Sequence, residues 1–420
     1  MPWWKPIYDF LYLSSSVFWF TSEYFKRSSS IRKNWLRERL GLVKEPQFEK
    51  EGSPIWLHGV SVGEVLALNP IIRELVKNYN LILTTVTDTG KTVAERNYGH
   101  LGVKVYYLPF DLDYAIRRFL RKTKPKALLI AETELWPNLI LVTSRYIPVA
   151  LINGRLSDRS YRRYHRFRFI FREILQRFTF IALQEELYQD RFLSLGIKRD
   201  KIFITGNLKF DLIIEEKSFP KLEFLKRPII IAGSTHPPEE ELILKAFLDV
   251  VKEGTLILVP RHPQRFDEVE YLIKREKPED TAFFRYSLLR EMEGCIPHHQ
   301  RAILLFDEMG LLKALYSISD IAIIGGSFIP HGGQNPLEAI YWEKPVITGP
   351  HMENFPFVEE FQRVCGLLKV SKEELPRAIK SLLDDRAFAK EVATKGYNLW
   401  IKKRGATEKT LELIRNLLNS

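Results

Sequence analysis

Short runs of apolar residues recur along the first half of the chain, separated by amphipathic segments. Each run has the length of a buried strand, and the segments between them, such as 64–77 and 114–121, place apolar residues at helical spacing. This alternation predicts a parallel sheet with helices on both faces. The predicted strands are residues 55–58, 81–86, 103–108, 127–131, 149–152 and 178–183.

The same alternation starts again near residue 228 and continues to a final amphipathic helix at 407–418. A chain of 420 residues is long enough for two domains of ordinary size. We therefore predict an α/β fold with two doubly wound, Rossmann-like domains and a cleft between them. The predicted boundaries are 1–40 for an N-terminal membrane-associated helix and basic segment, 41–212 for the first domain and 213–420 for the second.

Residues 1–24 are rich in aromatic and apolar side chains, but Lys5, Asp9 and the serines at 14–16 make a spanning helix marginal. No small-residue cleavage site follows, so a removable signal peptide is not expected. Basic residues come next, which favours a helix that spans the membrane or lies in its plane, with the following chain in the cytoplasm. The alternative is an amphipathic helix packed on its own domain. The basic residues are Lys26, Arg27, Arg32, Lys33, Arg37 and Arg39.

The formal charge of +11 favours anionic partners, which include nucleic acid, anionic lipid and phosphorylated substrates. Residues 155–177 interleave arginine with aromatic residues, as do nucleic-acid-binding proteins and surfaces that hold phosphorylated lipid. A nucleic-acid-binding protein would leave the glycines at the strand ends unused, so no nucleic-acid partner is expected. Cys295 and Cys365 form no metal-binding spacing and are predicted to be core thiols in a reducing compartment.

The stretch 320–339, DIAIIGGSFIPHGGQNPLEA, combines a strand, a glycine-rich loop and a helix that begins near Asn335. Backbone N–H groups at such a turn can hold a phosphate, and Glu338 could accept hydrogen bonds from a ribose. The alternative is a tight turn with a capped helix. Arg261 follows another strand of this half and suits a phosphate.

Loops of the first half carry carboxylates directly after predicted strands. Ser61 and Glu64 fit a capping box, and the other interpretation makes Glu64 a general base. Glu132 follows a buried run, where a carboxylate demands a partner. Asp111 and Asp113 form a D-x-D, which a helix N-cap and a first-turn acid explain better than a metal site.

Eight motifs occur in the order seen in the 3-deoxy-D-manno-octulosonic acid (Kdo) transferases of lipid A biosynthesis, and nearly the whole chain resembles that family. They are SVGE (61–64), ETELWPN (132–138), NGRLSDRS (153–160), GNLKFD (206–211), GSTH (233–236), VPRHPQRF (259–266), GGSFIPHGGQNPLEA (325–339) and GPHMENF (349–355). The resemblance implies the GT-B glycosyltransferase fold, with the acceptor bound by the N-terminal domain and the donor by the C-terminal one.

The resemblance also implies the reaction, which transfers Kdo from CMP-Kdo to lipid IVA, a phosphorylated lipid A precursor, with inversion. It makes Glu64 the proton acceptor and assigns Glu132 and Lys209 to stabilisation of the transition state. No cofactor or metal is expected, because CMP-Kdo is a co-substrate. The implied location is the cytoplasmic face of the inner membrane, against its anionic surface.

Donor and acceptor contacts are expected at the following residues. The resemblance places CMP at Pro260, Arg261, Met309, Gly310, Leu311, Asn335, Pro336, Leu337 and Glu338, although an acidic residue is common in the family where this chain has Leu311. The strand-end loops add Ser234, Thr235, His262, Gly326, Ser327 and Gly333. The expected acceptor contacts are Ser61, Gly63, Arg155, Arg162, Arg163 and Arg166. A GT-B transferase or epimerase that uses a UDP-sugar is the alternative. The number of Kdo residues transferred, the oligomeric state and the acylation of the acceptor stay open.

Overall fold

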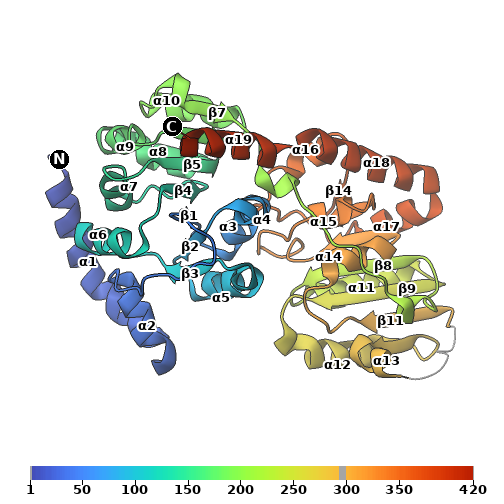
Figure 1. The fold of residues 1–420 in the computed structure, drawn as a ribbon. Coiled ribbons are helices and arrows are strands. Elements are labelled where there is room, and N and C mark those ends of the chain that lie inside the picture. The colour runs from blue at the N-terminus through green and yellow to red at the C-terminus, as the bar shows by residue number, and fades with distance from the viewer. Residues whose placement is uncertain (1, 293–298, 420) are drawn as a thin grey trace. The chain divides into compact units, whose positions relative to one another are not determined.

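The computed structural model describes residues 2–292 and 299–419. The chain forms two compact units (Figure 1). Unit 1 consists of residues 1–211 and 404–420, and unit 2 consists of residues 212–403. Each unit is built on one parallel sheet of seven strands.

The sheet of unit 1 has the strand order β3-β2-β1-β4-β5-β6-β7. Its strands pair in parallel, and β1, β2 and β4 are buried at every position. Continuous apolar runs rather than alternating ones form these strands because helices cover both faces. The strands are β1 (Ile55–His58), β2 (Leu81–Thr85), β3 (Lys104–Tyr107), β4 (Ala127–Ala131), β5 (Val149–Gly154), β6 (Phe180–Leu183) and β7 (Ile202–Ile204).

Helices of unit 1 pack around two hydrophobic clusters. One cluster includes Trp56 and Phe119, and the other includes Ile71 and Ile414. The helices are α1 (Lys5–Lys26), α2 (Ser29–Arg39), α3 (Val62–Ala67), α4 (Asn69–Asn78), α5 (Asp88–Tyr98), α6 (Asp113–Thr123), α7 (Pro137–Thr143), α8 (Asp158–Arg166), α9 (Arg168–Leu175), α10 (Leu187–Ser194) and α19 (Ala406–Asn419), with 3-10 turns η1 (Gly99–Leu101), η2 (Arg199–Lys201) and η3 (Leu208–Phe210).

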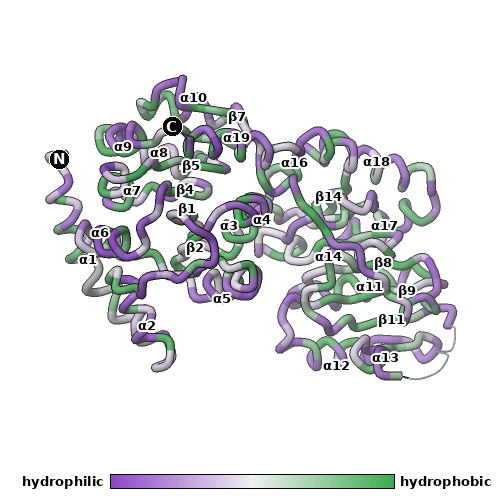
Figure 2. Tube along the Cα trace, viewed as in Figure 1, coloured by the Kyte–Doolittle hydropathy of each residue, from purple (hydrophilic) through white to green (hydrophobic). Residues whose placement is uncertain are grey.

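The sheet of unit 2 has the strand order β10-β11-β9-β8-β12-β13-β14 and is also parallel. Figure 2 shows hydrophobic residues along β8, β9 and β11, which lie in the middle of this unit. The strands are β8 (Ile229–Thr235), β9 (Gly254–Pro260), β10 (Ala282–Arg285), β11 (Arg301–Leu305), β12 (Ile321–Ile324), β13 (Val346–Thr348) and β14 (Leu368–Lys369).

Helices of unit 2 cover a core that includes Ile243, Phe247 and Ile379. The helices are α11 (Glu239–Val250), α12 (Phe266–Glu276), α13 (Tyr286–Glu291), α14 (Leu312–Leu315), α15 (Leu337–Ile340), α16 (Val358–Arg363), α17 (Leu375–Asp384) and α18 (Arg386–Lys403), with 3-10 turns η4 (Pro220–Leu222), η5 (Pro263–Arg265) and η6 (Tyr316–Ile318).

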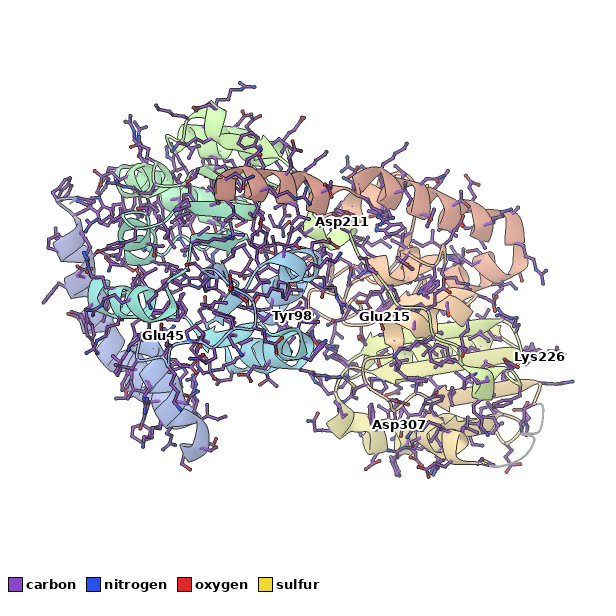
Figure 3. All side chains as sticks on the ribbon, in the orientation of Figure 1. Glu45, Tyr98, Asp211, Glu215, Lys226 and Asp307 are labelled. Carbon is purple, nitrogen blue, oxygen red and sulfur yellow. The ribbon has the colours of Figure 1, made fainter. Side chains whose placement is uncertain are left out.

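The final helix, α19, belongs to unit 1, whereas the sequence placed residues 404–420 in the second domain. Asp211, labelled in Figure 3, accepts hydrogen bonds from the backbone N–H groups of Gly405 (2.7 Å) and Thr407. Leu411 on α19 is buried in the core of unit 1. Unit 2 is therefore an insertion between the two parts of unit 1.

One face of α1, with the preceding Trp4, packs on the rest of unit 1. Trp4 is buried and donates to Glu173 (3.0 Å), and the Tyr8 hydroxyl donates to Asp111 (2.6 Å). Among the described residues, no helix is long and apolar enough to cross a membrane. Two of the basic residues that follow α1, Arg27 and Arg39, are buried and hydrogen-bonded within the protein, so they do not point to solvent as the sequence suggested.

Two smaller sequence interpretations differ from the structure. Asp111 does not cap α6, whose N-cap is Leu112; it accepts hydrogen bonds from the N–H groups of Asn138 and Leu139 at the beginning of α7. The prediction of a core thiol at Cys365 is wrong, because this residue is exposed, with φ of 55° just after α16. Cys295 lies outside the described residues.

Candidate functional site

Two carboxylates and two cations lie near the carboxyl ends of the strands of unit 1. Glu132 follows β4 directly, Arg155 follows β5 directly, and Lys209 lies in η3 after β7. Glu64 lies in the first turn of α3, after β1. Ligands of doubly wound sheets bind at this edge, so the side chains stand where a substrate is expected.

Glu64 has the hydrogen bonds of a helix cap and the electrostatics of a base. Its carboxylate accepts from the N–H of Val60 (2.7 Å) and from the Ser61 hydroxyl (3.2 Å), while Ser61 accepts from the N–H of Glu64. Burial, and then the charges of Glu132 and Glu134, raise the pKa of Glu64 to about 7. The capping interpretation is therefore correct, and it does not exclude the catalytic one, since a base works best with a pKa near the operating pH.

Glu132 is held between two cations. Its side chain is 6% exposed, accepts a hydrogen bond from Arg155 Nε (2.6 Å) and lies 3.9 Å from Lys209 Nζ. Burial lowers the pKa of Lys209, and the charge of Glu132 opposes that change. The backbone of Glu132 has φ of 55°, a conformation that costs energy for a non-glycine residue and often occurs at functional sites. The partner that the sequence required for Glu132 is therefore present.

Asn153 fixes the loop that carries Lys209. Its side-chain oxygen accepts from the N–H of Leu208 (3.0 Å), and its own φ is 54°. The side chain of Asn207 in turn donates to Gln184 (3.1 Å). These contacts link the ends of neighbouring strands, so the cation is held by a rigid framework rather than by a free loop.

Glu134 is a site residue that the sequence analysis did not select. Burial and the charge of Glu132 raise the pKa of Glu134 to about 7. A hydrogen bond from Trp136 and the charge of Arg163 partly offset this increase. Arg163 extends from α8, where Arg162 and Arg166 are also exposed. The E-x-E spacing at 132–134 could have indicated a second site carboxylate, because alternate residues after a strand point to one side.

Unit 2 holds its glycine-rich loop with a buried carboxylate. Glu239, 1% exposed at the beginning of α11, accepts from the N–H groups of Gly326 (2.6 Å), Ser327 (3.0 Å) and Phe328 (2.9 Å). The Ser327 hydroxyl is fully buried and accepts from the N–H of Gly349 (2.7 Å). The N–H groups of Gly326 and Ser327 thus have partners within the protein, and these two residues do not enter our proposal as direct contacts.

The loop that follows ends in a single helical turn rather than a longer helix. The Asn335 side chain accepts from the N–H of Leu337 (3.2 Å), but the N-cap of α15 is Pro336 rather than Asn335, and α15 has only four residues. A helix this short adds little macrodipole, so charges must come from side chains. Glu338 lies 3.5 Å from Lys313, and burial raises its pKa while Lys313 and Arg261 oppose the increase.

The remaining donor candidates differ in exposure. The exposed candidates are Arg261, His262, Met309 and Gly310. The half-buried ones are Ser234, Leu311 and Asn335, and the buried ones are Thr235, Pro260, Gly333, Pro336 and Leu337. Ser234 has φ of 58°, and the fully buried Thr235 accepts from the N–H of Arg261 (3.0 Å) through its carbonyl. His236, which packs on His262 and His331, has its pKa lowered to about 4 by burial and by those neighbours. The contact among these three histidines was not predicted, because they lie far apart in the sequence.

The model of a family described as 3-deoxy-D-manno-octulosonic-acid transferase matches residues 34–212. The 3-deoxy-D-manno-octulosonic acid transferase of Haemophilus influenzae is 38% identical over 380 residues, which are 87% of each chain. The chain belongs to this family. The transferase of Aquifex aeolicus is 32% identical over 334 residues, 78% of this chain and 86% of that one.

Solved structures show that this family member shares its fold with sugar-nucleotide enzymes. A UDP-GlcNAc 2-epimerase from Neisseria meningitidis matches with a TM-score of 0.56 at 15% identity, over 87% of this chain and all of that one. A glycosyltransferase from Rickettsia africae matches with a TM-score of 0.53 at 15% identity, over 88% and 99%. The prediction of two doubly wound domains of the GT-B class is confirmed, and the chain is a glycosyltransferase.

Proposed function

We propose that this glycosyltransferase moves Kdo from CMP-Kdo to a phosphorylated lipid A precursor, lipid IVA, in the synthesis of lipopolysaccharide. The observation that carries the proposal is the group of Glu64, Glu132, Arg155 and Lys209 at one edge of the sheet of unit 1. It combines a carboxylate of pKa about 7 with a buried carboxylate, Glu132, that pairs with two partly exposed cations. Membership of the family supports the substrate class.

In the proposed reaction an acceptor hydroxyl oxygen attacks the anomeric carbon of Kdo from the face opposite to CMP. The new C–O bond forms as the bond from that carbon to the phosphate oxygen breaks, and CMP leaves with the electron pair. Glu64 takes the proton of the hydroxyl, an effect worth roughly 10²–10⁴ in rate. Lys209 and Arg155 stabilise anionic groups, and Glu132 faces the positive charge that develops on the sugar.

Unit 2 is proposed to hold CMP-Kdo. Arg261 and Lys313 supply positive charge beside Glu338, which is suited to a ribose diol. Met309, Gly310 and Leu311 form an accessible segment that can meet the base through backbone groups. Because CMP-Kdo is consumed, it is a co-substrate, and no metal enters this mechanism.

The acceptor is proposed to meet unit 1 at the cytoplasmic face of the inner membrane. On α1, Ile7, Phe10 and Leu11 are 54%, 69% and 59% exposed, as expected of a helix that lies in the plane of a membrane surface. Leu11→Gln should weaken binding to phosphatidylcholine vesicles, whereas Leu288→Gln, at a leucine that is also 59% exposed, should not. Equal binding of both variants would contradict this placement.

The reaction is tested by mass spectrometry, with CMP-Kdo generated in situ and lipid IVA as acceptor. The wild-type chain should form product, Glu64→Gln should not, and Glu51→Gln, at an exposed glutamate, should match wild type. A cooperative thermal unfolding transition of the Glu64→Gln variant, at or above the temperature of wild type, shows that it is folded. A wild-type chain that transfers nothing but binds a UDP-sugar would replace this proposal with the UDP-sugar alternative. The mass of the product counts the sugars added.

A further inference from the structure

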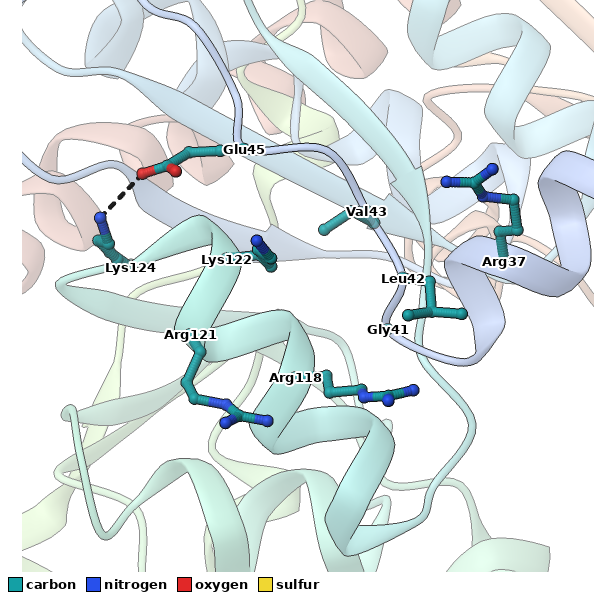
Figure 4. Close-up of a pocket in the computed structure, with 9 residues that line it drawn as sticks. All are labelled: Arg37, Gly41, Leu42, Val43, Glu45, Arg118, Arg121, Lys122 and Lys124. Carbon is teal, nitrogen blue, oxygen red and sulfur yellow. Dashed lines mark hydrogen bonds and ion pairs between the residues drawn. The ribbon is translucent and has the colours of Figure 1, made fainter.

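A basic pocket lies on the flank of unit 1, outside the group of residues described above. It has a volume of about 600 Å³ and is formed by the end of α2, the segment 41–45 and α6 (Figure 4). Because α6 starts after β3 and ends before β4, its last turn lies at the amino edge of the sheet, away from Glu64 and Glu132. The lining residues are Arg37, Gly41, Leu42, Val43, Glu45, Arg118, Arg121, Lys122 and Lys124.

Five cations meet only one carboxylate in this pocket. Glu45 pairs with Lys124 at 2.8 Å, the ion pair that is drawn in Figure 4. Within residues 2–292 and 299–419, the side chains of Arg37, Arg121 and Lys122 make no hydrogen bond and no close ion pair, although Lys122 is near enough to Glu45 to lower the pKa of that carboxyl group. The excess of positive charge around this hollow attracts anions.

The close approach that forms the pocket depends on one glycine. Gly41 has φ of 71°, and a Cβ at this position would lie 2.1 Å from the carbonyl oxygen of Ala115 in α6. Only glycine therefore lets the segment 41–45 lie against the helix. This contact brings Arg37, at the end of α2, to the cations at the end of α6. Stabilisation of each helix end by its own basic residues would not require the two ends to converge.

We propose that the pocket between α2 and α6 binds the phosphate group of an anionic phospholipid headgroup. Guanidinium groups from two helices can bind phosphate oxygens in pairs, which a single surface lysine cannot do. Leu42, 41% exposed among the cations, offers an apolar contact to the glycerol and acyl region that a free phosphate would not use. The inference rests on the proposed membrane placement, and it adds a lipid-specific site to the nonspecific apolar face of α1.

The first experiment measures binding of dihexanoylphosphatidylglycerol, kept below its micelle concentration, to the full chain. Dihexanoylphosphatidylcholine is the neutral control ligand. The variant Arg37→Gln/Arg121→Gln/Lys122→Gln should bind the anionic lipid at least tenfold more weakly. The matched control, Arg96→Gln/Lys198→Gln/Arg199→Gln, removes the same charge from exposed sites of unit 1 and should change binding less than twofold. Equal loss in both variants would overturn the pocket as a site.

Two further measurements identify the source of the phosphate and separate binding from folding. Glycerol phosphate that binds as tightly as the short-chain lipid would overturn the lipid assignment in favour of a soluble phosphorylated compound. The pocket variant should also unfold at nearly the same temperature as wild type, because the repulsion that it loses offsets the loss of favourable interactions with the helix ends and with Glu45. A large decrease would show that the cations are structural and would overturn the proposal.

Vesicles then separate this inference from the proposed function. Adding phosphatidylglycerol to phosphatidylcholine vesicles should strengthen binding of wild type but not of the pocket variant, while both bind neutral vesicles equally. No preference of wild type for anionic vesicles would overturn the inference. Because no sugar is transferred in these measurements, failure of the proposed reaction would leave their outcome unchanged.

Discussion

Replacing Glu64 by glutamine should increase the stability of the protein above neutral pH while removing its activity. Glutamine has nearly the shape of the protonated acid and cannot ionise. The pKa of Glu64 is raised from the usual 4.5 to about 7, mainly because the carboxyl group is buried. A raised pKa means that the folded protein binds the proton more tightly than the unfolded chain does.

The size of the effect follows from that shift. Between 4.5 and about 7, each pKa unit corresponds to about 1.4 kcal/mol, so ionisation of Glu64 costs the folded state up to about 3 kcal/mol. This stabilisation by the proton is fully present below pH 4.5 and is lost as the pH rises through about 7. The free energy of unfolding of Glu64→Gln minus that of wild type should therefore grow by up to about 3 kcal/mol between pH 4 and pH 8.

Denaturant unfolding at several pH values measures this difference, and Glu134→Gln is the matched control. Glu134 is half-buried, and its pKa is also raised to about 7, so its variant should show a similar gain in stability. Only Glu64→Gln should lose Kdo transfer by 10² or more, whereas Glu134→Gln should stay within tenfold of wild type. For wild type, kcat/KM should rise with pH and level off above about 7, as the base loses its proton.

Two results would refute the reasoning. A difference in unfolding free energy that does not change with pH would mean that Glu64 ionises as freely in the folded protein as in the unfolded chain. Kdo transfer by Glu64→Gln within tenfold of wild type would leave Glu64 as a helix cap and move the search for the base to Glu132.

Three further substitutions test packing and loop positioning. Glu239→Gln should lower the free energy of unfolding by about 1–3 kcal/mol, because the glutamine amide has only one acceptor oxygen for the N–H donors of the loop. The same variant should weaken CMP binding in calorimetry, and unchanged CMP affinity would contradict the positioning role. Gly41→Ala should lower the melting temperature more than Gly52→Ala, which has a similar positive φ and no neighbour within 4 Å; equal effects would show that the contact with α6 is loose. Glu38→Gln should cost about 3 kcal/mol because it leaves buried Lys91, 2.7 Å from Glu38, with only the more distant and exposed Glu95 (3.9 Å) as a partner. A loss below 1 kcal/mol in urea would contradict this.

The sequence predicted the central strands well because their signal is local. The run at 127–131 coincides with β4, and the run at 321–324 coincides with β12. The strands β7 and β14 at the sheet edges were missed, since they are only three and two residues long and not fully buried. A strand this short has too few positions to show a periodicity.

The sequence likewise indicated some residues of the candidate site and missed others. Glu64 and Glu132 were selected because they follow predicted strands, and Lys209 was selected from the resemblance to the Kdo transferases. The structure brings Glu132 and Lys209 to 3.9 Å, and the roles of all three stay predictions. The contacts of Glu239 were not found, since its partners Gly326 and Phe328 lie far away in sequence and donate through backbone groups, which leave no trace in side-chain identity. A glycine-rich loop whose N–H groups bind a phosphate therefore cannot be told from the sequence apart from one whose N–H groups bind a carboxylate of the protein.

The insertion of unit 2 into unit 1 has a consequence for synthesis of the chain. A ribosome completes residues 212–403 before it makes α19, so unit 2 can finish folding while unit 1 still lacks Leu411 and Ile414 from its core. Unit 1, although it comes first, must wait for the last residues with the apolar face at α4 uncovered. Asp211 can accept its hydrogen bonds from the N–H groups of Gly405 and Thr407 only after unit 2 has been made. Folding of unit 1 is therefore completed by a segment that follows unit 2 in the chain.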